Sequence, residues 1–374
     1  MKKIKVLHFP IRNTNGGITR SAMKYWNFID KDKFQFDFAT CSPKLDFEES
    51  IRQSGCKVHY ISCYAEQNPE QFCQEMKDIL LKGEYDVIHL NTSWWKGTLA
   101  EQVANEVGVK RIIVHARSTY VDINDRKKRE FELENHEKCK REFDIKLATH
   151  YMACSTAAAD FLFGPQIPRG KIIIFHNALD ITRYRYDTRI RNFMRQKLGL
   201  DDKYVIGNVG RFVYAKNHKF LIDCFYEVSK ICTKAILMLI GGGELENEMR
   251  RQVFEYGISD KVLFVGESDC VERYLQAMDV FAFPTRFEGL GNVLIEAQTA
   301  GLKCITSINV PRETEITENI GYLPLELNEW VSAILKYEKG YERKNMDLEI
   351  RKAGYDMIEE IKVLEKVYEG GGNL

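Results

Sequence analysis

Two carboxylates flank a glycine-containing segment between residues 284 and 297. Glu288 precedes Gly289 and Gly291, and Glu296 follows Glu288 by eight residues. Glycines let the backbone come close to a ligand, and the apolar residues that follow recur at helical spacing, so we expect a helix to begin after the loop. The first turn of a helix offers N–H groups to anions. One carboxylate could then face a reacting group and the other a hydroxyl-rich part of the same ligand.

A strand must hold this loop in place. Val280–Phe283 is a continuous apolar run that ends at Pro284, which is typical of a strand buried on both faces of a parallel sheet. The alternative is a strand–helix unit whose two carboxylates are only solvated. Spacing alone leaves that alternative open.

Two cations follow a second predicted strand, Tyr204–Gly210. Arg211 and Lys216 lie in a short loop, and Asn217 opens the next helix. Cations beyond the carboxyl end of a strand suit a diphosphate, since an arginine can bind it in a bidentate manner and a lysine as a point charge. A surface ion pair is the alternative for either residue alone.

Strand and helix patterns alternate from residue 3 to 116 and again from 204 to 307. This alternation predicts doubly wound parallel sheets, and the length of 374 residues favours two domains. Ligands of such sheets bind beyond the carboxyl ends of the strands. That rule places His115 at the edge of the first sheet, although a structural histidine is the alternative.

Composition excludes several classes of protein. The formal net charge of zero argues against a dedicated nucleic-acid binder, and the ten cysteines form no C-x-x-C pair. No Asp-x-Asp dyad stands at the end of a predicted strand either, so we expect no metal site. The longest apolar runs are too short to span a bilayer, so we expect a cytoplasmic protein. Residues 122–146 hold eight basic and eight acidic residues; a solvated helix is the favoured interpretation, and peripheral contact with anionic lipid on the inner face of the membrane is the alternative.

Taken together, the motifs resemble those of retaining glycosyltransferases of family 4. They are, in chain order, the Gly16-Gly17 pair, His115, NALD at 177–180, VGRF and KNH between 209 and 218, GGGE at 241–244, and PTRFEGLGNVLIEA at 284–297. The phrase EAQTAGLKCITS with a downstream VPRETEIT resembles the bacterial capsular and exopolysaccharide branch often called CapH-like or EpsF-like. Asn292 departs from the family, where proline is common.

The resemblance implies a GT-B fold of two Rossmann-like domains that face each other across a cleft. Residues 1–180 would form the acceptor-binding domain, 181–345 the nucleotide-sugar domain, and 346–374 a helix that packs back on the first domain. Residues 181–189 would be the linker. Glu288 and His115 would meet the transferred sugar, Arg211 and Lys216 the leaving diphosphate, and Glu296 the ribose. The remaining donor contacts implied are Gly16, Gly17, Gly243, Gly289, Leu290, Gly291, Asn292 and Val293.

The implied reaction moves a hexose or N-acetylhexosamine from a nucleotide diphosphate sugar, with UDP-sugar favoured, to a glycan acceptor, lipid-linked in the favoured reading, in capsular or exopolysaccharide biosynthesis. It needs no metal, because cations already stand at the leaving group. Two alternatives remain open at this point: a GT-B sugar-nucleotide epimerase, and a catalytically silent nucleotide-sugar sensor. Whether release of the nucleotide requires an acceptor separates the first alternative from a transferase.

Overall fold

The computed structural model describes residues 2–13, 17–121, 123 and 125–371. Contacts divide the chain into two compact units. The N-terminal unit holds Met1–Val121, Asp125–Asn177 and Met357–Leu374, and the C-terminal unit holds Ala178–Asp356. The predicted boundaries stood at 180 and 345, whereas the contacts divide the chain after residues 177 and 356.

The N-terminal unit is built on a parallel sheet of seven strands in the order β3-β2-β1-β4-β5-β6-β7. The order reverses where β1 lies beside β4, with Val6 paired to both Phe36 and Val87. The strands are β1 (Ile4–Phe9), β2 (Phe34–Thr40), β3 (Val58–Tyr60), β4 (Val87–Thr92), β5 (Arg111–Ala116), β6 (His150–Ala153) and β7 (Ile172–Ile174).

Helices cover both faces of this sheet because its strands carry apolar residues on both sides. Ile88 and Leu90 of β4 pack in one cluster with Met76 of α3. His89, between them, points to the opposite face and contacts Tyr368 of the final helix α15, which therefore packs within the N-terminal unit. The helices of this unit are α1 (Gly17–Phe28), α2 (Glu48–Gln53), α3 (Pro69–Gly83), α4 (Leu99–Val107), α5 (Arg126–Glu142), α6 (Thr156–Leu162) and α15 (Met357–Glu369).

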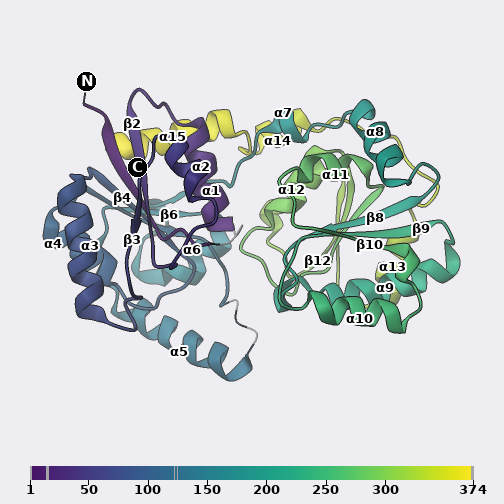
Figure 1. Cartoon of the computed structure of the whole chain (residues 1–374), viewed down its shortest axis with the longest axis horizontal. Helices are drawn as coiled ribbons and strands as arrows, with labels where there is room; N and C mark the ends of the chain where they lie inside the picture. The colour runs from purple at the N-terminus through teal and green to yellow at the C-terminus, as the bar shows by residue number, and fades with distance from the viewer. Residues whose placement is uncertain (1, 14–16, 122, 124, 372–374) are drawn as a thin grey trace. The chain divides into compact units, whose positions relative to one another are not determined.

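The C-terminal unit has a parallel sheet of six strands in the order β10-β9-β8-β11-β12-β13. In Figure 1, α8, α11 and α12 lie on one face and α9, α10 and α13 on the other. Each face has its own apolar core. Phe281 of β11 packs in the cluster with α8, α11 and α12, and Ala282 packs in the cluster with α9, α10 and α13. The strands are β8 (Tyr204–Val209), β9 (Ala235–Ile240), β10 (Val262–Gly266), β11 (Val280–Phe283), β12 (Lys303–Ser307) and β13 (Ile320–Leu323), and the helices are α7 (Ile181–Tyr184), α8 (Thr188–Leu198), α9 (His218–Ile231), α10 (Glu246–Glu255), α11 (Val271–Ala277), α12 (Asn292–Thr299), α13 (Leu327–Leu335) and α14 (Asp347–Lys352).

Residues 181–189 do not form the expected linker. Asp180 caps α7 by accepting a hydrogen bond from the Thr182 amide at 3.1 Å, and Ile181 is buried in the C-terminal unit. Asp187 caps α8 in the same way. Residues 181–189 lack an apolar period because they hold only the four-residue α7, the connecting turn and the start of α8.

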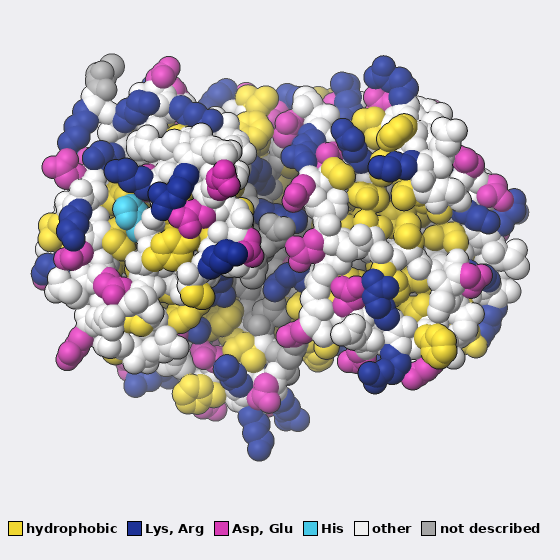
Figure 2. Space-filling view, in the orientation of Figure 1, with side chains coloured by type: hydrophobic (Ala, Val, Ile, Leu, Met, Phe, Trp, Pro, Cys, Tyr) yellow, Lys and Arg dark blue, Asp and Glu magenta, His cyan; other side chains and the backbone are white. Residues whose placement is uncertain are grey.

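Surface charge is mixed rather than segregated. On the face shown in Figure 2, Lys and Arg side chains are interspersed with Asp and Glu. The charged segment forms α5, where Arg126 pairs with Glu130 at 2.8 Å and His136 is the buried residue. Across the described ranges, no helix is both long and apolar enough to cross a bilayer. Contact of α5 with lipid stays a prediction.

Candidate functional site

Most of the donor residues predicted for the C-terminal unit lie where β8 and β11 are side by side in its sheet. The strand order reverses here, and the helices that follow the two strands, α9 and α12, lie on opposite faces. Doubly wound sheets bind ligands at this position, because the two strand-to-helix loops diverge there. One loop carries Arg211 and Lys216, and the other carries Glu288 and the glycines.

Hydrogen bonds join the two loops. The Thr285 hydroxyl donates to the Ala215 carbonyl at 2.8 Å, and the Arg286 amide donates to the same oxygen at 2.7 Å. The Arg286 guanidinium reaches the Tyr214 carbonyl at 2.9 Å. These bonds fix the loops relative to each other, so the charged residues they carry are held as one group.

Lys216 and Glu288, which lie 72 residues apart, form an ion pair. Their side chains are 19% and 13% exposed, so a ligand can reach them while much of the surrounding water is excluded. The Thr285 hydroxyl, which donates to the Ala215 carbonyl, lies 3.3 Å from the Glu288 carboxylate. The structure therefore brings the residue predicted for the sugar beside one predicted for the diphosphate.

The glycine loop ends at Gly291, which has φ of 82° and caps α12. A residue with a Cβ would be strained in this left-handed conformation. Leu290 turns its side chain into an apolar cluster with Ile295, so it anchors the loop and leaves only its backbone for a ligand. Asn292 opens the helix, and its buried Oδ1 has no hydrogen-bond partner in the described part of the chain.

Val293 and Glu296 occupy the first turns of α12. Val293 packs partly against the core, and Glu296, partly buried, lies about one turn after the helix begins. The N–H groups of the first turn point away from the helix body toward the loop. Gly289 lies in that loop and is partly buried.

Glycines that follow the neighbouring strand β9 pack against the loop that carries Arg211. A Cβ on Gly243 would stand 2.7 Å from the Phe212 carbonyl oxygen, and one on Gly241 would stand 2.2 Å from the Gly210 oxygen. Both positions need glycine because two backbones touch there. Gly243 thus positions the loop that presents the exposed Arg211, and its predicted direct contact with a donor stays a prediction.

His115 is fully buried in the N-terminal unit, with both ring nitrogens in hydrogen-bond contact. Nε2 lies 3.1 Å from the Arg117 guanidinium, and Nδ1 lies 3.0 Å from His89 Nε2. His89 Nδ1 contacts the Tyr368 hydroxyl at 2.8 Å, and that hydroxyl contacts His8 Nε2 at 3.1 Å. These contacts favour the structural alternative for His115, and contact with a donor sugar stays a prediction.

The direction of this chain of hydrogen bonds follows from its first member. Arginine can only donate, so His115 Nε2 accepts and its Nδ1 donates to His89. His89 then donates to Tyr368, and Tyr368 donates to His8. This arrangement needs neutral rings, and burial together with the Arg117 charge lowers the pKa of His8 to about 3 and that of His115 well below its ordinary value.

Arg117 is a candidate functional residue that the sequence analysis did not identify. Besides contacting His115, it donates to the Ser21 hydroxyl at 2.6 Å and the Tyr25 hydroxyl at 3.0 Å, so its guanidinium is held at the carboxyl edge of β5. Its place two residues after His115 was the available signal. Gly17 begins α1 and is exposed, and Gly16 lies outside the described residues.

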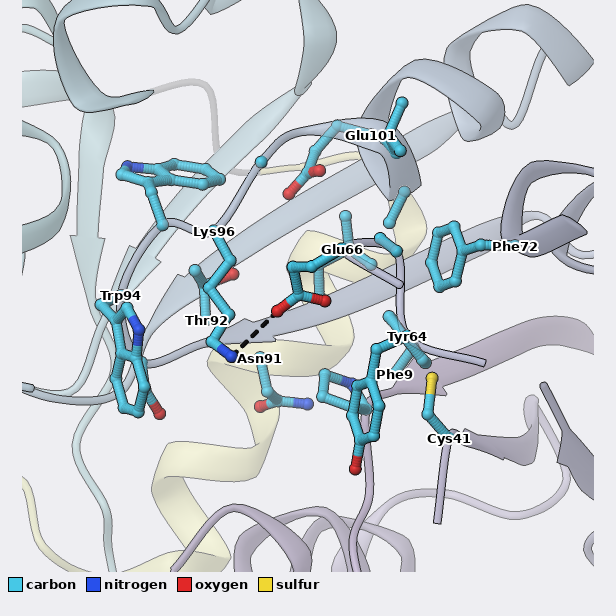
Figure 3. Close-up of a pocket in the computed structure, with 18 of the residues that line it drawn as sticks. Phe9, Cys41, Tyr64, Glu66, Phe72, Asn91, Thr92, Trp94, Lys96 and Glu101 are labelled. Atoms are coloured by element: carbon cyan, nitrogen blue, oxygen red, sulfur yellow. Dashed lines mark ion pairs between the residues drawn. The ribbon is translucent and has the colours of Figure 1, made fainter. Parts of the chain in front are cut away.

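A cavity of about 210 Å³ lies wholly within the N-terminal unit, among residues at and beyond the ends of β1, β2 and β4. Figure 3 shows its lining, with the ion pair between Lys96 and Glu66 as a dashed line. The two charges are 2.9 Å apart. Glu101 of α4 also lines the cavity, and within the described residues no cation pairs with it.

Replacing Glu101 with Gln should remove a pH-dependent loss of stability. Burial raises the pKa of Glu101 from about 4.5 to about 7, so between these values the folded protein holds a proton that the unfolded chain releases. Stability therefore falls as pH rises from about 4.5 to about 7 and stays lower above that, by up to ~3 kcal/mol. The free energy of unfolding of Glu101→Gln should exceed that of the wild type by ~2–3 kcal/mol at pH 8 and should equal it near pH 4.5.

Urea unfolding at both pH values measures this difference. Glu142→Gln, at an exposed position on α5, is the matched control and should follow the wild type at both pH values. If Glu101→Gln and the wild type were equally stable at pH 8, the claim that Glu101 is buried without a neighbouring cation would be wrong.

No group of three or more His, Cys, Asp or Glu residues that could hold a metal occurs within the ranges that the structure describes. The cations of the β8–α9 loop are the charges that this site offers to an anionic ligand. The site thus combines two cations, Arg211 and Lys216, with a helix N-terminus and two carboxylates. Together these groups suit a sugar joined to a diphosphate.

Residues 190–354 match the family described as Glycosyl transferases group 1. Among curated proteins, the chain is 26% identical to "Putative glycosyltransferase EpsF" of Bacillus subtilis (strain 168), over 97% of this chain and 96% of the relative. It is 21% identical to "UDP-Gal:alpha-D-GlcNAc-diphosphoundecaprenol alpha-1,3-galactosyltransferase" of Escherichia coli, over 87% of this chain and 85% of the relative.

Solved structures show the same fold. Anabaena Alr3699/HepE in complex with UDP and glucose superposes with a TM-score of 0.78 at 17% identity, over 98% of this chain and 100% of that chain. WaaG, a glycosyltransferase involved in lipopolysaccharide biosynthesis, superposes with a TM-score of 0.73 at 16% identity, over 98% of this chain and 100% of the WaaG chain. The predicted GT-B fold class is confirmed, and the sequence matches support a transferase of glycosyl groups.

Proposed function

We propose that this chain, a glycosyltransferase with the GT-B fold, moves a hexose or N-acetylhexosamine from a UDP-sugar to a lipid-linked glycan, with retention at the anomeric carbon. The observation that carries this proposal is the joined pair of loops at the β8–β11 switch point. They bring Lys216, Glu288 and the N-terminus of α12 together.

The charge that develops in the reaction explains this arrangement. Breaking a glycosyl phosphate leaves a diphosphate that gains negative charge, while the sugar becomes oxocarbenium-like. Arg211, Lys216 and the first-turn amides of α12 would stabilise the leaving group, because preorganised donors act where the charge forms. Glu288, held by Lys216, would lie against the sugar.

The activities named for similar proteins support the choice of donor and acceptor. HepE is described with UDP and with UDP-glucose, and the E. coli relative uses UDP-Gal and a diphosphoundecaprenol-linked acceptor. A Campylobacter jejuni relative, 32% identical over 34% of this chain, also acts on a diphospho-undecaprenol acceptor. We therefore propose UDP as the nucleotide and a polyprenyl diphosphate-linked glycan as the acceptor.

Retention is supported by the linkages in the same names. The E. coli and C. jejuni relatives form α linkages, and hexoses are α-linked in donors such as UDP-Gal. Attack from the face that the diphosphate leaves would preserve this configuration. The leaving phosphate can accept the proton of the attacking hydroxyl, so the step needs no protein nucleophile.

Release of UDP tests this function against its two alternatives. A transferase should release UDP from UDP-sugar at least tenfold faster when a polyprenyl diphosphate-linked sugar is present. An epimerase would convert the sugar without an acceptor, and a silent sensor would bind the donor and release nothing. The comparisons favour neither alternative.

We expect the reaction to be independent of divalent metal. Arg211 and Lys216 already supply positive charge for the diphosphate, and no metal-binding cluster occurs among the described residues. Turnover should change by less than twofold in EDTA. Loss of activity in EDTA, with recovery on addition of Mg²⁺ or Mn²⁺, would contradict this proposal.

A further inference from the structure

We propose that His8 and His89 form a proton-sensitive latch that holds α15 on the N-terminal unit. The helix docks while both rings are neutral, and in mild acid it is released while the sheet stays folded. The two rings come from β1 and β4, and the Tyr368 hydroxyl of α15 contacts both. The latch lies wholly within the N-terminal unit and does not depend on the proposed sugar transfer.

Tyr368 packs against a pair of stacked histidine rings. The centroids of the His8 and His89 rings lie 4.6 Å apart, and the angle between the ring planes is 22°. The Tyr368 hydroxyl lies 2.8 Å from His89 Nδ1 and 3.1 Å from His8 Nε2. All three side chains are fully buried. One hydroxyl group therefore joins α15 to two central strands of the sheet.

The hydrogen bonds around these rings leave no place for an added proton. Arg117 can only donate, so the bonds run in one direction, through His115 and His89 to Tyr368 and then to His8. A proton on His89 Nε2 would place two N–H groups 3.0 Å apart, because His115 Nδ1 already donates to that atom. A proton on His8 Nε2 would displace the Tyr368 proton, for which the described residues offer no other acceptor.

No negative charge offsets a proton on either ring. Within the described ranges, neither His8 nor His89 forms an ion pair with a carboxylate. Burial, together with the Arg117 charge, lowers the pKa of His8 to about 3 and that of His89 well below its ordinary value. The groups that face the two rings are Arg117 and His115 of β5, Tyr25 of α1, Tyr368 of α15, and the uncharged Phe36 and Phe38 of β2.

The helix α15 can leave the unit without removing a strand. The seven strands of the sheet pair with one another, and α15 supplies none of them. Its buried residues Leu364, Val367 and Tyr368 share one face of the helix, so release breaks the contacts of that face. Elements held in this way open at a lower free energy than the whole fold. Release therefore needs no unfolding of the sheet.

Protons favour the released helix. Above a pH of about 6.5 the rings are neutral in both states, so pH has little effect on docking. Below that pH, a ring uncovered by release takes up a proton that the docked ring excludes, so docking weakens as pH falls, down to about pH 3 for His8. Between pH 7.5 and 5.0 each ring raises the equilibrium constant for release by up to ~30-fold, and the two together by up to ~10³-fold.

Hydrogen exchange of the intact protein, followed by mass spectrometry of its peptides, tests the latch. The exchange rates of the α15 amides, corrected for the intrinsic effect of pH, give the equilibrium constant for release. In the wild type this constant should rise about a hundredfold or more between pH 7.5 and 5.0, while the amides of β4 keep their protection. A smaller rise in α15, or exchange of β4 in step with α15, would overturn the proposal.

Variants that cannot take up a proton assign the effect to the two rings. His8→Gln and His89→Gln keep a hydrogen-bond acceptor, and each should reduce the rise in the release constant by about 30-fold. The double variant should show a rise of less than about tenfold, and a larger rise would contradict the latch. The matched control is His59→Gln, whose ring contacts Tyr85 at 2.8 Å rather than α15; it should keep the wild-type rise.

Nitrogen NMR of the histidine rings tests the hydrogen bonds in the wild type, with no substitution that could disturb folding. At pH 7 the rings of His8, His89 and His115 should be neutral, with the proton on Nδ1 and none on Nε2. The unpartnered, buried Nδ1 of His8 fits this arrangement. A proton on Nε2 of His89 would overturn the proposal, because the direction of the bonds to Tyr368 would then be wrong.

Discussion

Glu288→Gln is expected to lower kcat by ~10²–10³, the scale for losing one preorganised polar group at a reacting centre. The reason lies in the geometry: Lys216 holds the Glu288 carboxylate at the β8–β11 switch point, beside the residues proposed for the diphosphate. Binding of UDP should hardly change, because UDP lacks the sugar that Glu288 would contact. Acceptor-dependent release of UDP and calorimetric titration of UDP measure the two quantities.

Glu296→Gln is the matched control for this prediction. It changes the same group on the same segment, one turn into α12, where the carboxylate should accept hydrogen bonds from the ribose. This variant should weaken donor and UDP alike by ~1.5–3 kcal/mol. If Glu288→Gln impaired UDP affinity and Glu296→Gln spared it, the proposed orientation of the donor would be reversed.

Arg211→Ala should weaken binding of UDP by ~1.5–3 kcal/mol, which corresponds to roughly 10- to 150-fold in Kd, because a charge-assisted bond to the diphosphate is lost. Lys216→Ala should have an effect of the same size. Lys219→Ala, an exposed cation on the first turn of α9, should have none. Calorimetry with UDP measures all three.

Uridine provides a second control for the cations. It lacks the diphosphate, so Arg211→Ala and Lys216→Ala should bind it as the wild type does. Equal losses for UDP and uridine would mean that the variants disturb the loop rather than the phosphate contact. The double variant Lys216→Ala/Glu288→Gln should show non-additive losses, because the two residues form an ion pair.

The sequence predicted the sheets well because both are buried on both faces. Runs such as Val280–Phe283 and Ala235–Ile240 are apolar throughout, which is the pattern of a central parallel strand. The edge strand β13 was missed, since Ile320–Leu323 contains Gly321 and is only partly buried. The final helix was predicted as a helix, and its fully buried Tyr368 fixes it in the N-terminal unit.

The sequence predicted the residues of the candidate site but not the contacts between them. Motif spacing pointed to Lys216 and Glu288 separately, and only the pairing of β8 with β11 brings them together. His115 was placed at the correct edge of the sheet, but its chain of partners runs through Tyr368, in the last helix, to His8. The cavity was missed because its lining comes from several separate segments, none of which carries a motif.

The anomeric configuration of the first product tests the central claim, retaining transfer at the donor site of the C-terminal unit, most directly. Proton NMR of the sugar formed from a UDP-α-hexose and a polyprenyl diphosphate-linked acceptor would identify the new linkage. We expect an α linkage in the wild type, formed at a rate that falls ~10²–10³-fold in Glu288→Gln. A β linkage would contradict it, because inversion needs attack from the opposite face of the sugar and a base that the proposed mechanism does not include.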